Sequence, residues 1–313
     1  MSKYHVHPMP SDESVNGRVA GVRRSFGPYR LERILSEGAT GIVIEAQHRL
    51  LDRRVKTFNP RGFERSGLTV SGLSELFLHE ARVLASIDHP HVVPILDAGW
   101  ARGGELEIEI PYLALKLMRG DLLDHATRHG PLSSAAALRL ARDRAAGLLA
   151  THEAGWLHRD LKPANVLLDA TGAANLSDYS AALACESTGI AIPRLIGTAG
   201  YLAPELLAGG PPDRCSDVYA LGATLFFALH AVAPHAWPPG ALERWVRQGR
   251  RADGRLDRTF PGLRAIVGLA LQADPGERYP SAAELLLDCR RLLLGEAPQH
   301  AQQRRPGRLF AST

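Results

Sequence analysis

The chain has 313 residues, enough for one large domain or two modest domains with a substantial buried core. Its 37 basic residues exceed its 33 acidic residues by only four, which predicts no strong electrostatic attraction to nucleic acid or to a membrane surface. The three cysteines form no CxxC pair, so neither a zinc site nor a disulfide framework is indicated. Because the N-terminus lacks an apolar signal core and the longest apolar stretch is short and broken, we expect a cytoplasmic protein with no nucleic-acid or membrane partner.

The predicted elements fall into two regions that follow a flexible arm at residues 1–25. From residue 26 to about 117, short alternating segments such as YRLERIL and GIVIEA predict a small sheet, and GLSELFLHEARVLASI predicts one long helix. Apolar residues spaced three and four apart dominate from about 118 to 295 and predict a mostly helical region. The polar, proline-containing segment 296–313 is predicted to be disordered.

The first motif, LSEGATGIV, lies between two predicted strands. It places Gly38 and Gly41 in a G-x-x-G spacing, and backbone N–H groups that approach phosphates need residues without side chains in the way. A lone G-x-x-G is usually only a turn, but the next predicted strand, RRVKTF, contains Lys56. The chain has only four lysines, so a lysine at this place is less readily an accident than an arginine. Lys56 on the next predicted strand therefore favours a phosphate-binding loop over a simple turn.

The most informative motif is HRDLKPANVLL, which is followed by DYS. Phosphoryl transfer needs the phosphates held, their charge neutralised and the acceptor hydroxyl aimed. The run supplies Asp160, Lys162, Asn165 and Asp178 in that order, which suggests a catalytic base, a phosphate-binding cation and two magnesium ligands. An Asp followed by an Asn is by itself usually a solvated turn, but the full string matches the catalytic loop of kinases. On these residues the sequence resembles the eukaryotic-like protein kinase family, most closely its bacterial Ser/Thr members, from about Phe26 to Leu294.

The resemblance implies an α+β, bilobal protein-kinase-like fold. Its small β-rich N-lobe, with one long helix, would cover about residues 26–117, and its larger, mainly helical C-lobe about residues 118–295. It also implies ATP and Mg²⁺ as cofactors and a Ser or Thr hydroxyl of a protein substrate as the acceptor. The implied catalytic residues are Asp160 as the base, Lys162 on the developing charge, Lys56 on the α- and β-phosphates, and Glu80 as the partner of Lys56.

The resemblance further implies a nucleotide site built from the first lobe and the catalytic loop. Ser36 stands where the first glycine of the loop would be, Val43 would cover the adenine, and Leu115 would lie behind it. The backbone of Lys116 and Met118 would bind the adenine itself. The full implied set is Ser36, Gly38, Gly41, Val43, Lys56, Lys116, Met118, Asn165 and Asp178, of which Asn165 and Asp178 would bind Mg²⁺.

Residues outside the catalytic loop match structural positions of the family. Glu205 in GTAGYLAPE is the expected partner of Arg278, and Asp217 in SDVYALG is expected to brace the catalytic loop, since a buried charge must be paired. Thr198 lies in the expected substrate-facing loop, and Lys162 precedes a proline as in Ser/Thr-specific members. This set favours a protein kinase over a small-molecule kinase.

Four residues depart from the family pattern: Ser36, Arg54, Tyr179 and Ser180. Tyr179 can fill an aromatic pocket if its hydroxyl finds a partner or water. The Cβ of Ser180 disfavours, by about 1–2 kcal/mol, the positive φ angles open to glycine, which should restrict switching of the segment. These departures leave open a pseudokinase that acts as a nucleotide-dependent or nucleotide-free protein-binding module.

Regulation is predicted only in outline. Arg159 precedes the predicted base, and in the family this residue often pairs with a phosphate on the activation segment. We therefore expect autophosphorylation among Ser187, Thr188 and Thr198.

Overall fold

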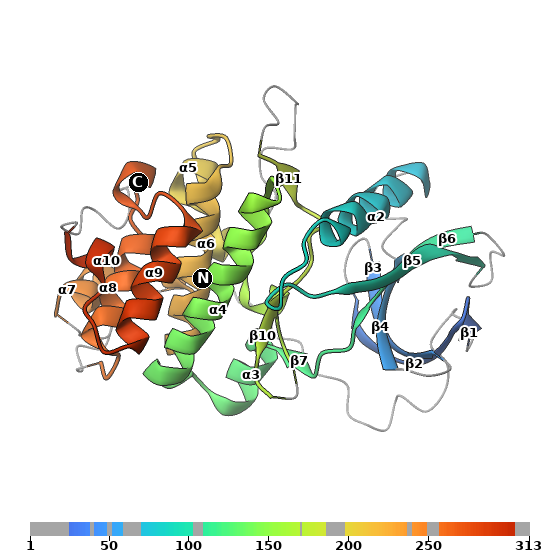
Figure 1. Ribbon diagram of the computed structural model, residues 1–313, viewed down its shortest axis with the longest axis horizontal. Helices are drawn as coiled ribbons and strands as arrows, with labels where there is room; N and C mark the ends of the chain where they lie inside the picture. The colour runs from blue at the N-terminus through green and yellow to red at the C-terminus, as the bar shows by residue number, and fades with distance from the viewer. Residues whose placement is uncertain are drawn as a thin grey trace, which may run out of the picture. The chain divides into compact units, whose positions relative to one another are not determined.

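The structure, a computed structural model, describes residues 25–37, 41–48, 52–58, 70–102, 109–169, 171–185, 198–236, 240–248 and 257–303 (Figure 1). Residues 1–24 of the predicted arm, Gly38, Ser187, Thr188 and residues 304–313 lie outside these described ranges. The chain divides into two compact units, one of residues 1–77 with 96–117 and one of residues 78–95 with 118–313. The change near residue 117 is at the expected place, whereas residues 78–95, expected in the first lobe, group with the second unit.

The first unit is built on a six-stranded sheet in the order β1-β2-β3-β4-β6-β5. The strands are β1 (Ser25–Phe26), β2 (Tyr29–Glu37), β3 (Gly41–His48), β4 (Asp52–Phe58), β5 (Ile95–Arg102) and β6 (Glu109–Lys116). Ile42, Ile44 and Ala46 alternate along β3 and are buried, as expected for a strand with one face on a core. Ser25, expected at the end of a flexible arm, instead pairs with Arg30 in the sheet. The sheet predicted for this region is therefore present in the structure.

The long helix predicted for the first region is α2 (Val70–Ala85). Leu76 on this helix packs against the core of the sheet. Glu80, one turn later, is buried and groups with the second unit.

Helices form most of the second unit. They are α3 (Leu122–His129), α4 (Ser134–Glu153), α5 (Pro204–Leu207), α6 (Arg214–His230), α7 (Ala241–Gln248), α8 (Pro261–Ala270), α9 (Ala282–Leu293) and α10 (Gln299–Gln303). α4 packs against α6 and α9, and α6 is buried along almost its whole length (Figure 1). Asp213 begins α6 with a capping box shared with Ser216, which satisfies N–H groups that the first turn leaves unpaired.

Short strands bring the catalytic motifs of the second unit together. β7 (Gly120–Asp121), β9 (Val166–Leu168) and β10 (Ala174–Leu176) form one small sheet, and β8 (Trp156–Leu157) pairs with β11 (Leu183–Ala184) in another. The motif HRDLKPAN connects β8 to β9 and includes the 3₁₀ helix η2 (Pro163–Asn165). The DYS segment connects β10 to β11, and because β10 pairs with β9 and β11 pairs with β8, both motifs link the same two small sheets.

Residues 296–303 differ from the expectation of disorder after Gly295. The carboxylate of Asp288 on α9 is fully buried and accepts hydrogen bonds from the backbone N–H groups of Gln299, His300 and Ala301 at 2.7–3.1 Å. The hydroxyl of Tyr279 donates to the same carboxylate at 2.9 Å. Polar composition predicted disorder here, but a single buried acceptor is enough to fix the start of α10.

In the part of the chain that the structure describes, no helix combines the length and the apolar character that a bilayer crossing requires.

Candidate active site

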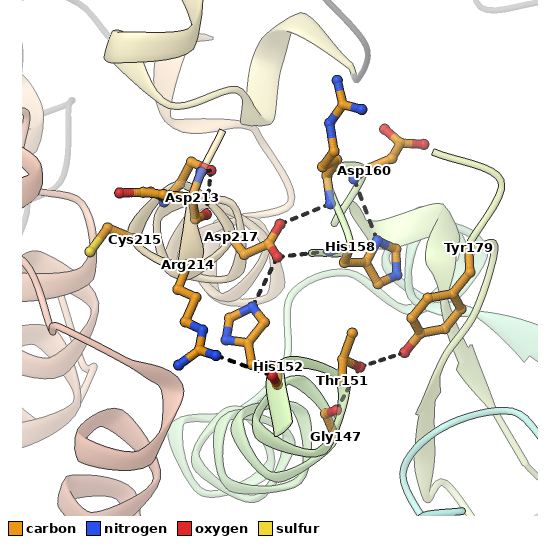
Figure 2. Close-up of polar contacts among 12 residues, drawn as sticks. Gly147, Thr151, His152, His158, Asp160, Tyr179, Asp213, Arg214, Cys215 and Asp217 are labelled. Atoms are coloured by element: carbon orange, nitrogen blue, oxygen red, sulfur yellow. Dashed lines mark hydrogen bonds and ion pairs between the residues drawn. The ribbon is translucent and has the colours of Figure 1, made fainter. Parts of the chain in front are cut away.

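The catalytic loop is anchored from α6 by the buried carboxylate of Asp217 (Figure 2). Its Oδ2 accepts the backbone N–H of His158 and its Oδ1 accepts the backbone N–H of Arg159, each at 2.8 Å. Arg159 has a φ of 68°, a left-handed conformation that costs a non-glycine residue about 1–2 kcal/mol. Asp217 thus holds a strained residue directly before Asp160, and the predicted brace is confirmed by these contacts.

Asp217 keeps its charge although it is buried. Burial by itself raises the pKa of Asp217. Three interactions outweigh this effect and bring the pKa below its ordinary value: the hydrogen bond and charge interaction with His152, the charge interaction with His158 and the hydrogen bond from the N–H of Arg159. Nε2 of His152 lies 3.0 Å from Oδ2 of Asp217. His152 and Asp217 are both almost completely buried, and His152 lies in the last turn of α4. The brace is therefore an ionised acceptor that strengthens the hydrogen bonds it receives.

Asp160 lies in a small polar cluster with the other residues of the motif. Its Oδ2 is 2.6 Å from Nζ of Lys162 and accepts a hydrogen bond from Nδ2 of Asn165 at 3.1 Å. The same Nδ2 also donates to the backbone oxygen of Asp160 at 2.8 Å. Within the described ranges, Oδ1 accepts one long contact, from the hydroxyl of Thr198 at 3.4 Å. The geometry therefore holds Oδ2 with two donors and leaves Oδ1 as the oxygen better able to accept another proton.

Asn165 and Asp178 offer oxygen atoms of the kind that Mg²⁺ prefers. Both bonds of Asn165 to Asp160 use its Nδ2, which leaves the amide oxygen outside them. The N–H and the hydroxyl of Ser177 both donate to the backbone oxygen of Asn165, at 3.0 and 3.1 Å, and so place Asp178 one residue from this anchor. The donor set fits a hard cation held by an amide oxygen and a carboxylate.

Tyr179 and Ser180 fit this structure without strain. Tyr179 is fully buried, its hydroxyl lies 2.9 Å from Oγ1 of Thr151, and its ring centroid lies 4.5 Å from that of His158 (Figure 2). Ser180 does not have a positive φ; the left-handed residue is Asp178, at 62°. The Cβ of Ser180 therefore carries no penalty in this conformation, and its hydroxyl donates to Oδ1 of Asp178 at 2.9 Å.

The predicted pair of Glu205 and Arg278 is confirmed as a two-pronged ion pair. Nη1 and Nη2 of Arg278 each lie 2.6 Å from a carboxylate oxygen of Glu205. Arg278 is fully buried, and its guanidinium also lies over the ring of Tyr219 at 4.9 Å. This geometry ties the end of the activation segment to the loop before α9.

A small pocket opens beside Asp160 in the second unit. Asp160 and Thr198 line it together with the apolar side chains of Leu202, Leu206 and Ala220. The pocket has room for about one water molecule, and its apolar lining is buried.

The first unit carries the predicted nucleotide-binding residues of the N-lobe. Strand register aligns Ser36 with Val43, Val43 with Lys56, and Lys56 with Leu113, in one row across four strands. Ser36 is exposed and Val43 is half-buried, whereas the side chains of Arg54 and Lys56 and the burial of Gly41 lie outside the described part. The pairing of Lys56 with Glu80 therefore stays a prediction.

The residues expected to flank the adenine lie at the end of β6 and directly after it. Leu115 and Met118 are buried and Lys116 is exposed. Their contribution through the backbone also stays a prediction.

Sequence reasoning missed Thr151 and His152, which join α4 to the two motifs. A polar Thr-His pair within the apolar stretch GLLATHEAG was the available signal. It could not name the partners, because Tyr179 and Asp217 lie 28 and 65 residues away in the chain.

A braced catalytic loop with an Asp-Lys-Asn cluster, a neighbouring Asp178 and a buried Glu-Arg pair define the class of phosphotransferases with a protein-kinase fold. Comparison with known proteins agrees, since the protein kinase domain family matches residues 29–278. The chain belongs to the protein kinase family.

Its curated relatives include serine/threonine-protein kinases of Mycobacterium tuberculosis. PknB is 33% identical over 232 residues, which cover 71% of this chain and 36% of PknB. PknK is 34% identical over 259 residues, covering 80% of this chain and 22% of PknK. PknA is 30% identical over 283 residues, covering 90% of this chain and 64% of PknA. The chain thus spans about a third of the length of PknB and less than two thirds of PknA.

Proposed function

We propose that the protein is a Ser/Thr protein kinase that transfers the γ-phosphoryl group of Mg-ATP to a Ser or Thr hydroxyl of a protein substrate. The observation that carries the proposal is the Asp160 cluster, in which one carboxylate oxygen is held by Lys162 and Asn165 while the other is left for a proton. The names of the relatives support the reaction class.

Each residue of the cluster has a role that follows from its chemistry. Asp160 aims the acceptor hydroxyl and receives its proton, and Lys162 stabilises negative charge that develops on the transferred group. Asn165 and Asp178 would hold Mg²⁺, and Lys56 with Glu80 would hold the α- and β-phosphates. When bound, Mg-ATP supplies the phosphoryl group and a cation that neutralises its charge.

The test is the transfer of labelled phosphate from Mg-ATP to the protein itself and to a generic basic protein substrate. Asp160→Asn removes the proton acceptor at constant size, and Asp178→Ala removes a magnesium ligand. We expect transfer by the wild type and loss of transfer in both variants, with nucleotide binding largely kept in Asp160→Asn. Asp88→Asn, at an exposed position on neither motif, is the matched control and should keep full activity.

A pseudokinase that only binds partners is the alternative raised by the four departures from the family pattern. The paired hydroxyl of Tyr179 and the relaxed φ of Ser180 favour catalysis over this alternative. A thermal-shift titration with Mg-ATP separates them, because a ligand that binds only the native state raises the melting temperature. Absence of any shift, together with absence of transfer in the wild type, would favour the binding module.

The remaining predictions from sequence concern the setting of the reaction. A cytoplasmic location and the lack of nucleic-acid and membrane partners stay predictions. Autophosphorylation among Ser187, Thr188 and Thr198 also stays a prediction, and phosphosite mapping on the purified protein tests it.

A further inference from the structure

The hydroxyl of Tyr179 has one hydrogen-bond acceptor among the residues that the structure describes. Thr151 donates its only hydroxyl proton to the backbone oxygen of Gly147, at 2.9 Å, one turn back on α4. Because that proton is used, the 2.9 Å contact between Thr151 and Tyr179 must be a hydrogen bond that Tyr179 donates. The chain of donors runs one way, from Tyr179 to Thr151 to Gly147 (Figure 2).

This bond adds something that a phenylalanine at position 179 could not supply. The ring of Tyr179 packs on His158 of the catalytic loop, as an apolar ring also could. Only the hydroxyl fixes the segment to α4, whose Thr151 is fully buried and cannot exchange its partner for bulk water.

The residues on both sides of Tyr179 are held as well. Ser180 donates to Oδ1 of Asp178 at 2.9 Å, a contact that glycine could not make. Two positions later, the backbone oxygen of Ala182 lies 2.8 Å from Nε2 of His79 on α2. The backbone N–H of Ala182 in turn donates to the oxygen of Tyr179 at 3.0 Å. The conformation of residues 178–182 therefore depends on side chains from outside the segment and within it.

We propose that Thr151 is a positioning residue, which acts through the hydroxyl of Tyr179 to hold residues 178–180 in the conformation that presents Asp178 to magnesium. The catalytic role of Thr151 rests on the proposed function. The hydrogen bond itself, and the local opening of residues 178–180 that it opposes, do not depend on that function. A neutral hydrogen bond of ordinary strength shifts such an opening equilibrium by about fivefold.

Substitutions of Tyr179 and of Thr151 should have different consequences, because only the second leaves a buried polar group without a partner. Tyr179→Phe removes the donor, and Thr151 still donates to Gly147, so no group is orphaned. Thr151→Val leaves the hydroxyl of Tyr179 fully buried without its acceptor, which costs more than the bond itself. Thr151→Ser keeps the hydroxyl and should behave as the wild type. The double variant Thr151→Val with Tyr179→Phe removes the orphan and should recover the stability that Thr151→Val loses.

The chain offers a matched control for each change. Thr224 on α6 is also buried and also donates to the carbonyl one turn back, that of Ala220 at 2.9 Å. Tyr219 is also fully buried, and its hydroxyl has no hydrogen-bond partner among the described residues. Thr224→Val therefore repeats the loss of a helix-bonded hydroxyl, and Tyr219→Phe repeats the loss of a buried phenol hydroxyl without the loss of a hydrogen bond, both away from Asp178.

The experiment is native-state hydrogen exchange, read at the amides of Ser177 and Ala182 and compared with amides of α9. We expect Tyr179→Phe to raise exchange at Ala182 about fivefold, Thr151→Val to raise it further, and Thr151→Ser and both controls to leave it unchanged. Calorimetric titration should show weaker Mg-ATP binding in Tyr179→Phe, by up to about fivefold, with binding of ATP in EDTA unchanged.

Three results would overturn the proposal. Exchange at Ala182 could stay unchanged in Tyr179→Phe, exchange could rise equally in α9, or Mg-ATP affinity could stay unchanged while Ala182 opens. The first would show that the Tyr179–Thr151 bond does not hold the segment, and the second would show general destabilisation. The third would show that the bond holds the segment without positioning Asp178. Hydrogen exchange does not require turnover. An inactive wild type would therefore contradict the proposed function but not the role of the Tyr179–Thr151 bond in holding residues 178–180.

Discussion

Two buried aspartates hold two loops by the same contact, yet they serve different parts of the molecule. Asp217 accepts the N–H groups of His158 and Arg159, and Asp288 accepts those of residues 299–301. Asp217 holds a left-handed Arg159 next to Asp160, whereas none of the residues 299–301 has a positive φ. Burial and hydrogen bonding are therefore similar at the two sites, and what distinguishes the Asp217 brace is that it holds the strained residue next to Asp160.

Asp217→Asn tests most directly whether the brace at Asp217 is needed for catalysis. The amide has the same size, but its NH₂ group cannot accept an N–H, so one of the two backbone donors loses its partner. We expect the free energy of unfolding to fall by about 3 kcal/mol. Phosphoryl transfer per folded molecule should fall by at least about tenfold, because Arg159 loses its anchor and Asp160 shifts. Chemical denaturation and the labelled-phosphate assay measure the two effects, and full activity in this variant would contradict the role of the brace.

Asp288→Asn is the matched change at the other site. It should lower the free energy of unfolding by about 2 kcal/mol, since a buried acceptor again becomes a donor. Turnover per folded molecule should stay at the wild-type level, because α10 packs on α8 and α9, which carry none of the catalytic residues. A loss of turnover as large as that of Asp217→Asn would mean that the two braces are not functionally distinct.

Acid should act on the catalytic side of the comparison through His158. Burial is the largest influence on His158 and lowers its pKa, so the folded protein holds it neutral while the unfolded chain binds a proton near its ordinary pKa of about 6.5. The unfolded state then binds more protons below about pH 6.5, and the free energy of unfolding falls there by up to about 1.4 kcal/mol per pH unit for this group.

His158→Phe isolates that contribution. The ring against Tyr179 is kept and the proton is removed, while the other buried histidines contribute equally to both proteins. Melting temperature measured from pH 7.5 to 5 should fall less steeply in His158→Phe than in the wild type. Equal slopes would show that His158 does not titrate on unfolding.

The smallest expected effect concerns a buried charge that has no carboxylate brace. Arg144 on α4 is fully buried, and its Nε and Nη2 have no hydrogen-bond partner within the described ranges. Its Nη1 donates to the backbone oxygen of His91 at 3.2 Å, but that oxygen also accepts from the N–H of Leu176. Arg144→Met should therefore stabilise the fold by about 1 kcal/mol, visible as a higher melting temperature. A lower melting temperature would show that Arg144 is paired within the native protein.

The sequence predicted the residues whose spacing is local and fell short where partners are distant. Asp160, Lys162 and Asn165 lie within six positions, so one string indicated the cluster that the structure brings together. The two-part fold followed from the change of hydrophobic period near residue 117. By contrast, composition gives no sign that Thr151 would accept the hydroxyl of Tyr179.

The C-terminal segment shows the same limit. Its polar composition predicted disorder, yet the deciding group is Asp288, which lies eleven positions before Gln299 on another helix. A pattern read along the chain does not reveal an acceptor that is buried on a neighbouring helix.

The brace at Asp288 also determines where the chain can be shortened. The family match ends at residue 278, before both α9 and α10. A chain stopped at residue 278 would lose α9, which packs on α4, and one stopped at Gly295 would keep Asp288 but remove three of its donors. The smallest stable folding unit should therefore extend past Ala301, so the family match alone would place the cut too early.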